Sequence, residues 1–118
     1  MPSDQTSRAL HEMLRHIDLA TAFVAGMQQD TFEADIRAVY AVTRCLEIIS
    51  EASRRLSDDL KLRHPTIAWR QMSAAGNVYR HQYEYVAGHF IWETVQQSLP
   101  PLSRAIETEI ALLKPPEA

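Results

Sequence analysis

Apolar residues near the start of the chain recur at intervals of three, four and seven, which is the spacing of one helix face. Arg15 and Asp18 fall between these positions, on the side that would meet water. The pattern predicts an amphipathic helix from about Asp4 to Gln28. Its apolar stripe consists of Leu10, Met13, Leu14, Ile17, Val24 and Met27.

A second helix is predicted to begin at Asp30, because an N-cap acceptor with Glu33 three residues later satisfies free backbone amides reciprocally. This helix carries two apolar stripes. One contains Phe32, Ile36, Val39, Tyr40 and Leu46, and the other contains Val42, Cys45, Ile49 and Leu56. A helix that is apolar on two faces buries both, either at the centre of a bundle or against a second subunit. We therefore expect a dimer.

The next break is predicted between Asp58-Asp59 and His64-Pro65, since a residue before proline is biased away from helix. A third, shorter helix is expected from about Ala68. In the stretch 77–86 aromatic residues alternate as in a strand, and Gly76 is of a type that ends helices. No partner strand is visible elsewhere, so we expect a helix end that passes into a loop, a common place for binding and catalytic groups.

Two further apolar groups predict the closing helices, the first ended by Pro100-Pro101 and the second by Pro115-Pro116. Their apolar positions are Phe90, Ile91, Val95 and Leu99, followed by Leu102, Ile106, Ile110 and Leu113. The whole pattern predicts an all-α bundle of four to five helices in one domain, residues 1–118.

The composition supports one ordinary globular domain, since 46% of the 118 residues are hydrophobic and 23% are charged. The net charge of -3 argues against broad nonspecific coating of nucleic acid but permits a local basic cleft. A single cysteine, Cys45, excludes an internal disulfide. No stretch is apolar over the ~20 residues that a membrane span requires, and no export signal precedes the first helix. We expect a cytoplasmic protein with no membrane partner.

Two patterns suggest metal or thiol chemistry only superficially. His11-Glu12 resembles the opening of a zinc-binding helix, but Arg15 stands where the second histidine belongs and His16 points in another direction. Cys45 lies among apolar residues, which predicts an unreactive thiol. We expect neither a metal ion nor another cofactor.

Glu47 and Glu51 are one helical turn apart, a spacing that suits paired acid and base groups or a divalent ion. Arg44, Arg54 and Arg55 are close in sequence, which favours a surface or interface network of ion pairs. The alternative is that Glu51 orients a basic residue across a cleft.

The strongest chemical signal lies between Asn77 and Tyr85, where an amide, an arginine, a histidine and tyrosines follow each other. Unperturbed histidine is the side chain that changes charge near neutrality, so His81 is the candidate to exchange a proton with a ribose hydroxyl or a leaving oxygen. Arg80 is able to hold a phosphate. The alternative is a partly buried histidine among tyrosines that pack the bundle.

From the second helix onward, the chain resembles the HepT-like ribonuclease toxins of the HEPN superfamily, which are all-helical and paired with a minimal nucleotidyltransferase antitoxin. The resemblance is carried by the stretches 32–35, 49–52, 56–57 and 65–69, by Asn77, His81 and Tyr83, and by the stretches 91–95 and 99–102. Jointly these motifs are specific. The resemblance implies a HEPN-type bundle whose two subunits face each other across a cleft.

In this family the ribonuclease site contains an arginine and, after four intervening residues, a histidine. A polar residue stands beside the arginine, and a tyrosine stands two residues after the histidine. The resemblance places His81, Asn77 and Tyr83 at the histidine, polar and tyrosine positions, whereas Gly76 stands at the arginine position. Ala87 stands where the family usually has an aspartate.

The resemblance implies that RNA is cleaved without a metal ion. The histidine helps a 2'-hydroxyl attack the adjacent phosphate, and the arginine binds that phosphate. Glycine has no side chain that could bind the phosphate. Loss of one hydrogen-bond donor to a developing oxyanion lowers the rate roughly a hundred- to a thousandfold. Arg80, directly before His81, is one candidate to replace it. Arg54 and Arg55 are others, supplied across a dimer.

The nucleotidyltransferase of such a pair adds an adenylyl group to the tyrosine that matches Tyr83, which would exclude RNA by charge and bulk.

The leading hypothesis is an endoribonuclease toxin. The alternative is a catalytically degenerate HEPN binding protein, lacking the arginine, that serves as partner or adenylylation target of the nucleotidyltransferase. A bundle without chemistry would have His81 and Tyr83 buried and packed.

Overall fold

The computed structural model describes residues 2–81 and 87–113, with side chains for residues 4–76 and 88–113. Within these ranges the chain forms helices and turns only, which confirms the predicted all-α class. The elements are α1 (Pro2–Val24), α2 (Gln29–Ala34), α3 (Ile36–Ser53), α4 (Asp58–Leu62), α5 (Trp69–His81), α6 (Ala87–Glu93), the π-helical segment η1 (Thr94–Ser98) and α7 (Leu99–Leu113). None of the described helices is long and apolar enough to cross a membrane.

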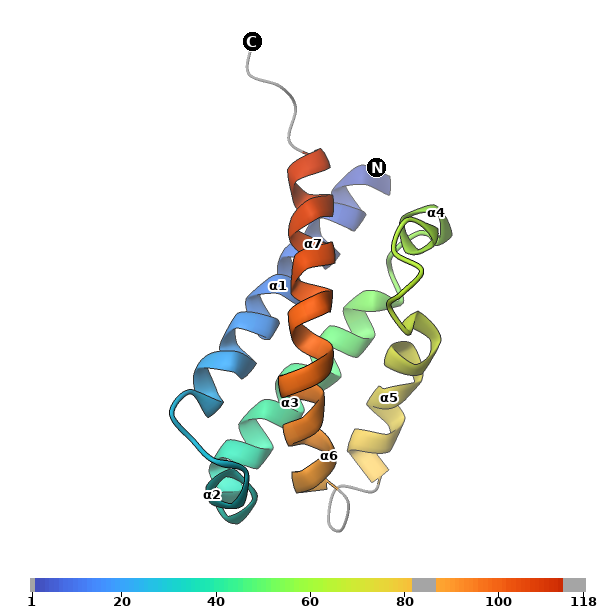
Figure 1. Ribbon diagram of the computed structural model, residues 1–118. Coiled ribbons are helices and arrows are strands. Elements are labelled where there is room, and N and C mark those ends of the chain that lie inside the picture. The colour runs from blue at the N-terminus through green and yellow to red at the C-terminus, as the bar shows by residue number, and fades with distance from the viewer. Residues whose placement is uncertain (1, 82–86, 114–118) are drawn as a thin grey trace.

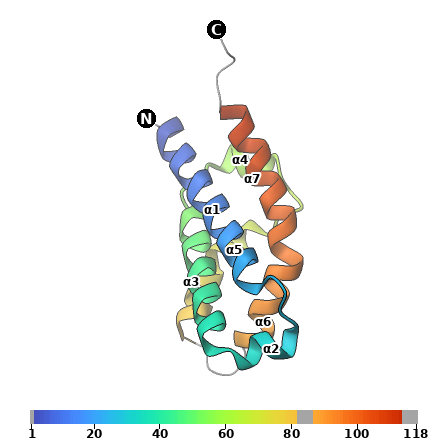
Figure 2. The ribbon, with the colours of Figure 1, turned by 90° about the vertical axis from the view of Figure 1, so that its left-hand side faces the viewer.

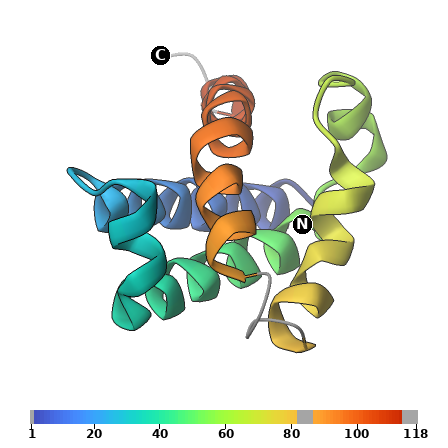
Figure 3. The same ribbon diagram turned by 60° about the horizontal axis from the view of Figure 1, so that its bottom comes forward.

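The long helices pack around a shared apolar core. Helix α3 contacts α1 and α5, and α1 also contacts α7 (Figure 1). Figure 2 shows α1 between α3 and α7, and Figure 3 shows α5 and α2 on opposite sides of the molecule. The largest fully buried side chains include Leu10, Met13, Phe32, Ile91, Leu102 and Ile106. The predicted apolar stripes of the first and last helices therefore supply much of this core.

Helix α1 ends at Val24, earlier than the predicted end at Gln28. The chain turns at Gly26, whose φ of 80° lies in the left-handed region that glycine adopts without strain. The amide of Met27 donates to the carbonyl of Val24 at 2.9 Å and closes the turn. The boundary was missed because the apolar spacing continues through Met27 although the backbone does not.

The helix predicted to begin at Asp30 is in fact two helices. Asp35 has an extended backbone between α2 and α3, and its carboxylate accepts a hydrogen bond from the amide of Ala38 at 3.1 Å. Asp30 instead lies in the first turn of α2, and its carboxylate accepts from the adjacent amide of Thr31 at 2.8 Å. The predicted cap at Asp30 is therefore wrong, and Asp35 caps the long helix.

The two predicted apolar stripes of this region differ in burial. The stripe containing Val42, Cys45, Ile49 and Leu56 is buried. The other stripe is split, because Phe32 and Leu46 are buried whereas Ile36 and Tyr40 are 66% and 56% exposed. The start of α3 therefore presents apolar side chains on its outer face.

The break predicted between α3 and the third helix contains a short helix, α4, capped by the Ser57 hydroxyl, which accepts from the amide of Leu60 at 3.2 Å. Helix α5 begins at Trp69, close to the predicted start. It passes through Gly76 without a break and reaches His81. The rest of the predicted loop, residues 82–86, lies outside the described residues.

The two predicted closing helices form one continuous helical run, α6–η1–α7. Pro100 and Pro101 do not end the first helix; they lie in the first turn of α7. Neither proline has an N–H to donate to the preceding turn, and the chain there adopts the wider π-helical turn, with the amide of Leu99 donating to the carbonyl of Thr94. The predicted stop at these prolines is therefore wrong, since proline is tolerated in a first turn.

Candidate functional site

The last turn of α5 carries three of the predicted site residues. Asn77, Arg80 and His81 all lie on α5, and their side chains are outside the described part of the structure. Tyr83 lies outside the described residues altogether. Positions 73, 76, 77 and 80 follow helical spacing and share one face of α5, with position 81 at its edge. The residues just before the predicted site therefore show what this face contacts.

That face crosses α3 through small hydroxyl side chains. The Ser50 hydroxyl donates to the carbonyl of Ser73 at 3.1 Å and accepts from the amide of Gly76 at 3.2 Å. Ser53 is fully buried, and its hydroxyl lies 3.3 Å from that of Ser73. Small side chains let the two backbones approach closely, and these bonds fix α5 against α3.

Gly76 is buried at this crossing, where a side chain would meet Ser50 at close range. A Cβ atom at position 76 would lie 3.0 Å from the Ser50 Oγ, closer than ordinary van der Waals contact. It would also lie 4.0 Å from one terminal guanidinium nitrogen of Arg54. Ser50 thus approaches position 76 closely, and Arg54 lies beside it.

Arg54, the C-cap residue of α3, extends onto α5. Its Nε donates to the carbonyl of Ser73 at 3.1 Å, and its Nη2 donates to the same oxygen at 2.7 Å. The side chain is otherwise exposed. A positive charge at the C-terminus of a helix is favoured by the helix dipole, so α3 itself stabilises this cation.

The other predicted support residues lie apart from α5. Arg55 points to α1, where its Nη2 lies 3.3 Å from the Glu12 carboxylate. Glu51 is exposed, and its carboxylate makes no hydrogen bond or ion pair to another described side chain. Arg44 and Glu47 form only a 4.0 Å contact. Of Glu51, Arg54 and Arg55, only Arg54 is joined to the α5 site by described contacts.

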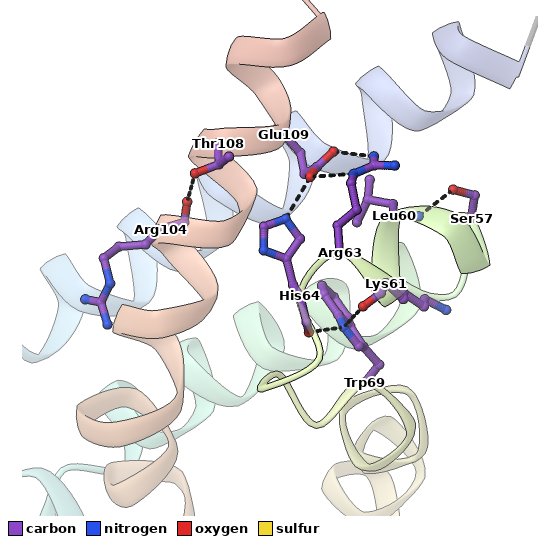
Figure 4. Close-up of polar contacts among 9 residues, drawn as sticks. All are labelled: Ser57, Leu60, Lys61, Arg63, His64, Trp69, Arg104, Thr108 and Glu109. Atoms are coloured by element: carbon purple, nitrogen blue, oxygen red, sulfur yellow. Dashed lines mark hydrogen bonds and ion pairs between the residues drawn. The ribbon is translucent and has the colours of Figure 1, made fainter.

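A second polar cluster lies at the far end of α7 (Figure 4). Glu109 is 3% exposed; Arg63 donates to both its carboxylate oxygens at 3.2 and 2.6 Å, and the His64 Nε2 lies 2.7 Å from one of them. The Arg63 hydrogen bonds, and then the His64 contact, lower the pKa of Glu109 although burial opposes this. Both carboxylate oxygens are contacted by Arg63 or His64, so the cluster joins α7 to the loop between α4 and α5.

The histidines of α1 bond to their own helix, and the cysteine of α3 is buried. The Nδ1 atoms of His11 and His16 each lie 2.8 Å from a carbonyl one turn earlier in α1. Burial raises the pKa of the Cys45 thiol, which disfavours the thiolate. Across the described side chains, no group of three or more histidine, cysteine, aspartate or glutamate residues is placed to hold a metal ion.

Two pockets border α5 and its preceding loop. A mostly apolar pocket of about 400 Å³ lies between α5 and the η1–α7 junction, with Met72, Ala75 and Leu99 in its wall. A smaller one of about 250 Å³ is lined in part by His64, Arg104 and Thr108. The polar α3–α5 crossing at Ser73 and Gly76 precedes His81 on the same helix.

Sequence reasoning missed the roles of Ser50 and Ser73 in this crossing and of Glu109 in the second cluster. Ser50 and Ser73 are 23 residues apart, and Glu109 is 46 residues from Arg63. Neither periodicity nor local spacing predicts contacts between residues so far apart in the sequence. The only available signal was the run of small residues in α3 and at Gly76.

Comparison with known proteins gives a consistent picture. A family model described as ribonuclease HepT-like matches residues 13–109. A protein of Thermococcus cleftensis named "Probable ribonuclease HepT" is 34% identical over 98 residues, which cover 83% of this chain and 89% of that protein. "Putative RNase MJ1216" of Methanocaldococcus jannaschii is 28% identical over 107 residues, covering 91% of this chain and 88% of that protein. No solved structure matches.

Proposed function

The chain belongs to the HepT-like ribonuclease family, and from that premise we propose that it is the toxin of a toxin–antitoxin pair, an endoribonuclease that needs no metal ion. The observation that carries the proposal is the family match across residues 13–109, within which α5 presents His81 at its last turn. The relatives named as ribonucleases support the reaction class.

In the proposed reaction His81 takes the proton of a ribose 2'-hydroxyl. The 2'-oxygen then forms a bond to the adjacent phosphorus, and the bond from phosphorus to the 5'-oxygen of the next nucleotide breaks. The leaving oxygen takes a proton, so the products are a 2',3'-cyclic phosphate and a free 5'-hydroxyl. Histidine suits both proton transfers because its pKa in water lies near neutrality. Asn77 and Arg80 are proposed to bind the RNA beside it.

The proposed working unit is a homodimer with a cleft between two α5 helices. Ile36 and Tyr40 are exposed apolar side chains at the start of α3. They support an interface that includes this face of α3. The proposed antitoxin is a minimal nucleotidyltransferase that adenylylates Tyr83. The added phosphodiester would place negative charge and bulk two residues from His81 and repel RNA.

The test is incubation of the purified protein with total RNA in the presence of a metal chelator, with a His81→Ala variant in parallel. We expect the wild-type protein to cleave RNA and the variant to lose cleavage. Equal cleavage by both would contradict the assignment of His81. Cleavage that appears only with added divalent metal would contradict the metal-independent mechanism.

Gly76 favours a second candidate function, a HEPN binding protein without catalysis, because the family's arginine is absent from this position. This candidate predicts no cleavage by either protein at high concentration, together with adenylylation of Tyr83 by the nucleotidyltransferase. The same experiment thus distinguishes an enzyme from a modification target.

A further inference from the structure

We infer that Arg54 of α3 is the phosphate-binding cation of the α5 site and acts within the same chain. This inference rests on the proposed function, because it names the group that holds the phosphate of the RNA next to His81. It differs from the sequence-based expectation, in which Arg54 or Arg55 would be supplied across the dimer.

Arg54 is held in one place by the polar crossing of α3 and α5. The carbonyl of Ser73 accepts the Arg54 Nε, the Arg54 Nη2 and the Ser50 hydroxyl at 3.1, 2.7 and 3.1 Å. Ser50 is 2% exposed, so one side of this anchor is embedded in the protein. A guanidinium fixed in this way loses little further entropy when it binds a ligand.

The guanidinium keeps donors for an anion. Arginine has five N–H donors, and the contacts with Ser73 use one from Nε and one from Nη2. Among the described side chains, no carboxylate forms an ion pair with Arg54, whereas Arg55 is paired with Glu12 and Arg63 with Glu109. Arg54 is thus a positioned, exposed positive charge whose remaining donors suit a phosphate oxygen.

The position of Arg54 explains how glycine is accommodated at position 76. A side chain that began at residue 76 would start 3.0 Å from the Ser50 Oγ and 4.0 Å from the Arg54 Nη2. It would therefore crowd the Ser50 hydroxyl and lie beside the Arg54 guanidinium. A guanidinium from α3 thus lies next to the position where a cation from α5 would begin.

The separation from His81 fits a shared phosphate. His81 is five residues beyond Gly76 on the same helix, a rise of about 7.5 Å along the axis. Positions 76 and 81 also differ by about 140° around the helix axis, so the proposed phosphodiester would lie across this part of the α5 surface, between the two groups. Arg54 would bind the nonbridging oxygens and stabilise the charge that develops as the 2'-oxygen attacks.

The decisive experiment compares Arg54→Ala with Arg55→Ala in the full-length protein. Both variants lose one exposed arginine from the same end of α3, but Arg55 contacts α1 and not α5. We expect Arg54→Ala to reduce kcat for RNA cleavage by a hundred- to a thousandfold, and Arg55→Ala to remain within about threefold of wild type. Thermal unfolding of each variant, followed by circular dichroism, establishes that the protein is folded.

Rescue separates binding of phosphate from a structural role. Guanidinium ion at millimolar concentration, below the denaturing range, should restore part of the activity of Arg54→Ala and none of that of His81→Ala. Arg54→Lys keeps the charge but loses the bidentate geometry, so we expect intermediate activity. Equal kcat for Arg54→Ala and Arg55→Ala, with both folded, would overturn the inference.

A binding measurement keeps the inference distinct from the proposed function. The probe is a fluorescent single-stranded RNA carrying 2'-O-methyl groups, which cannot be cleaved. Arg54→Ala should weaken its binding about tenfold and lower the slope of log K against log salt by about 0.7, as expected for one lost phosphate contact. Arg55→Ala should change neither. If the wild-type protein binds the probe but does not cleave RNA, the proposed function fails while the assignment of Arg54 as a phosphate-binding group is kept. If both variants bind the probe as tightly as the wild-type protein, the inference about Arg54 fails.

Discussion

Glu109 shows how a single buried charge is accommodated in this protein. Its carboxylate is almost fully buried, yet Arg63 and His64 provide donors to its oxygens (Figure 4). Removing a charge from water is costly unless such partners replace the lost hydration. The lowered pKa of Glu109 reports that the charged form is favoured in the folded state, chiefly through the hydrogen bonds from Arg63.

We predict that Glu109→Gln lowers the free energy of unfolding at pH 7 by about 1–3 kcal/mol, because hydrogen bonds to a charged group become bonds to a neutral one. The pH dependence has a definite sign. The folded-state pKa of Glu109 is below its usual value of 4.5, so its stabilisation is complete above about pH 4.5 and is lost as the pH falls through the folded-state pKa. The difference between wild type and variant in urea unfolding should therefore shrink in acid.

Glu107→Gln is the matched control for this prediction, because Glu107 lies on the same helix and is exposed. Its effect should stay within about 0.5 kcal/mol. A Glu109→Gln protein as stable as wild type at pH 7 would show that the cluster contributes no net stability.

Asp35 matters at the scale of an element, since it separates α2 from α3 and caps the longer of the two. We predict that Asp35→Ala lowers the free energy of unfolding by about 1 kcal/mol, as loss of an N-cap acceptor does. Asp30→Ala, which removes only a bond to the neighbouring amide, should have the smaller effect. Chemical unfolding of both variants measures this, and the reverse order would contradict the assignment of the cap.

The helices themselves were largely predictable, because apolar spacing reports which face of a segment is buried. Their boundaries were not, since Gly26, Asp35 and Pro100 act through backbone geometry that the spacing does not record. Within the candidate site, the resemblance points to position 76 and His81, and their roles stay a prediction. The contact of Arg54 with Ser73 depends on how α3 crosses α5, and no local pattern reveals that crossing.

At the scale of the whole molecule, the residues of the proposed dimer contact and the proposed phosphate-binding arginine lie on different parts of α3. Its start presents Ile36 and Tyr40 outward, while its end holds Arg54 against α5. The residues of the proposed dimer contact and Arg54 can therefore be substituted separately. A change at one should leave the other folded.

We predict that the wild-type protein is a dimer and that Ile36→Asp shifts it toward monomer, because a charge on the apolar face of α3 would have to be desolvated in the interface. Leu62→Asp is the control, since Leu62 is 75% exposed on α4, away from this face. Size-exclusion chromatography with light scattering measures the mass of each. A wild-type monomer at micromolar concentration would contradict the dimer.

The continuous run α6–η1–α7 has a mechanical consequence. It begins at Ala87, six residues after the end of α5, and about 33 Å further along its axis Glu109 contacts Arg63 and His64 in the loop that precedes α5. The ion cluster therefore links the far end of this long helical run to the chain just before α5. We expect the position of the start of α5 against α7 to depend in part on the Glu109 carboxylate.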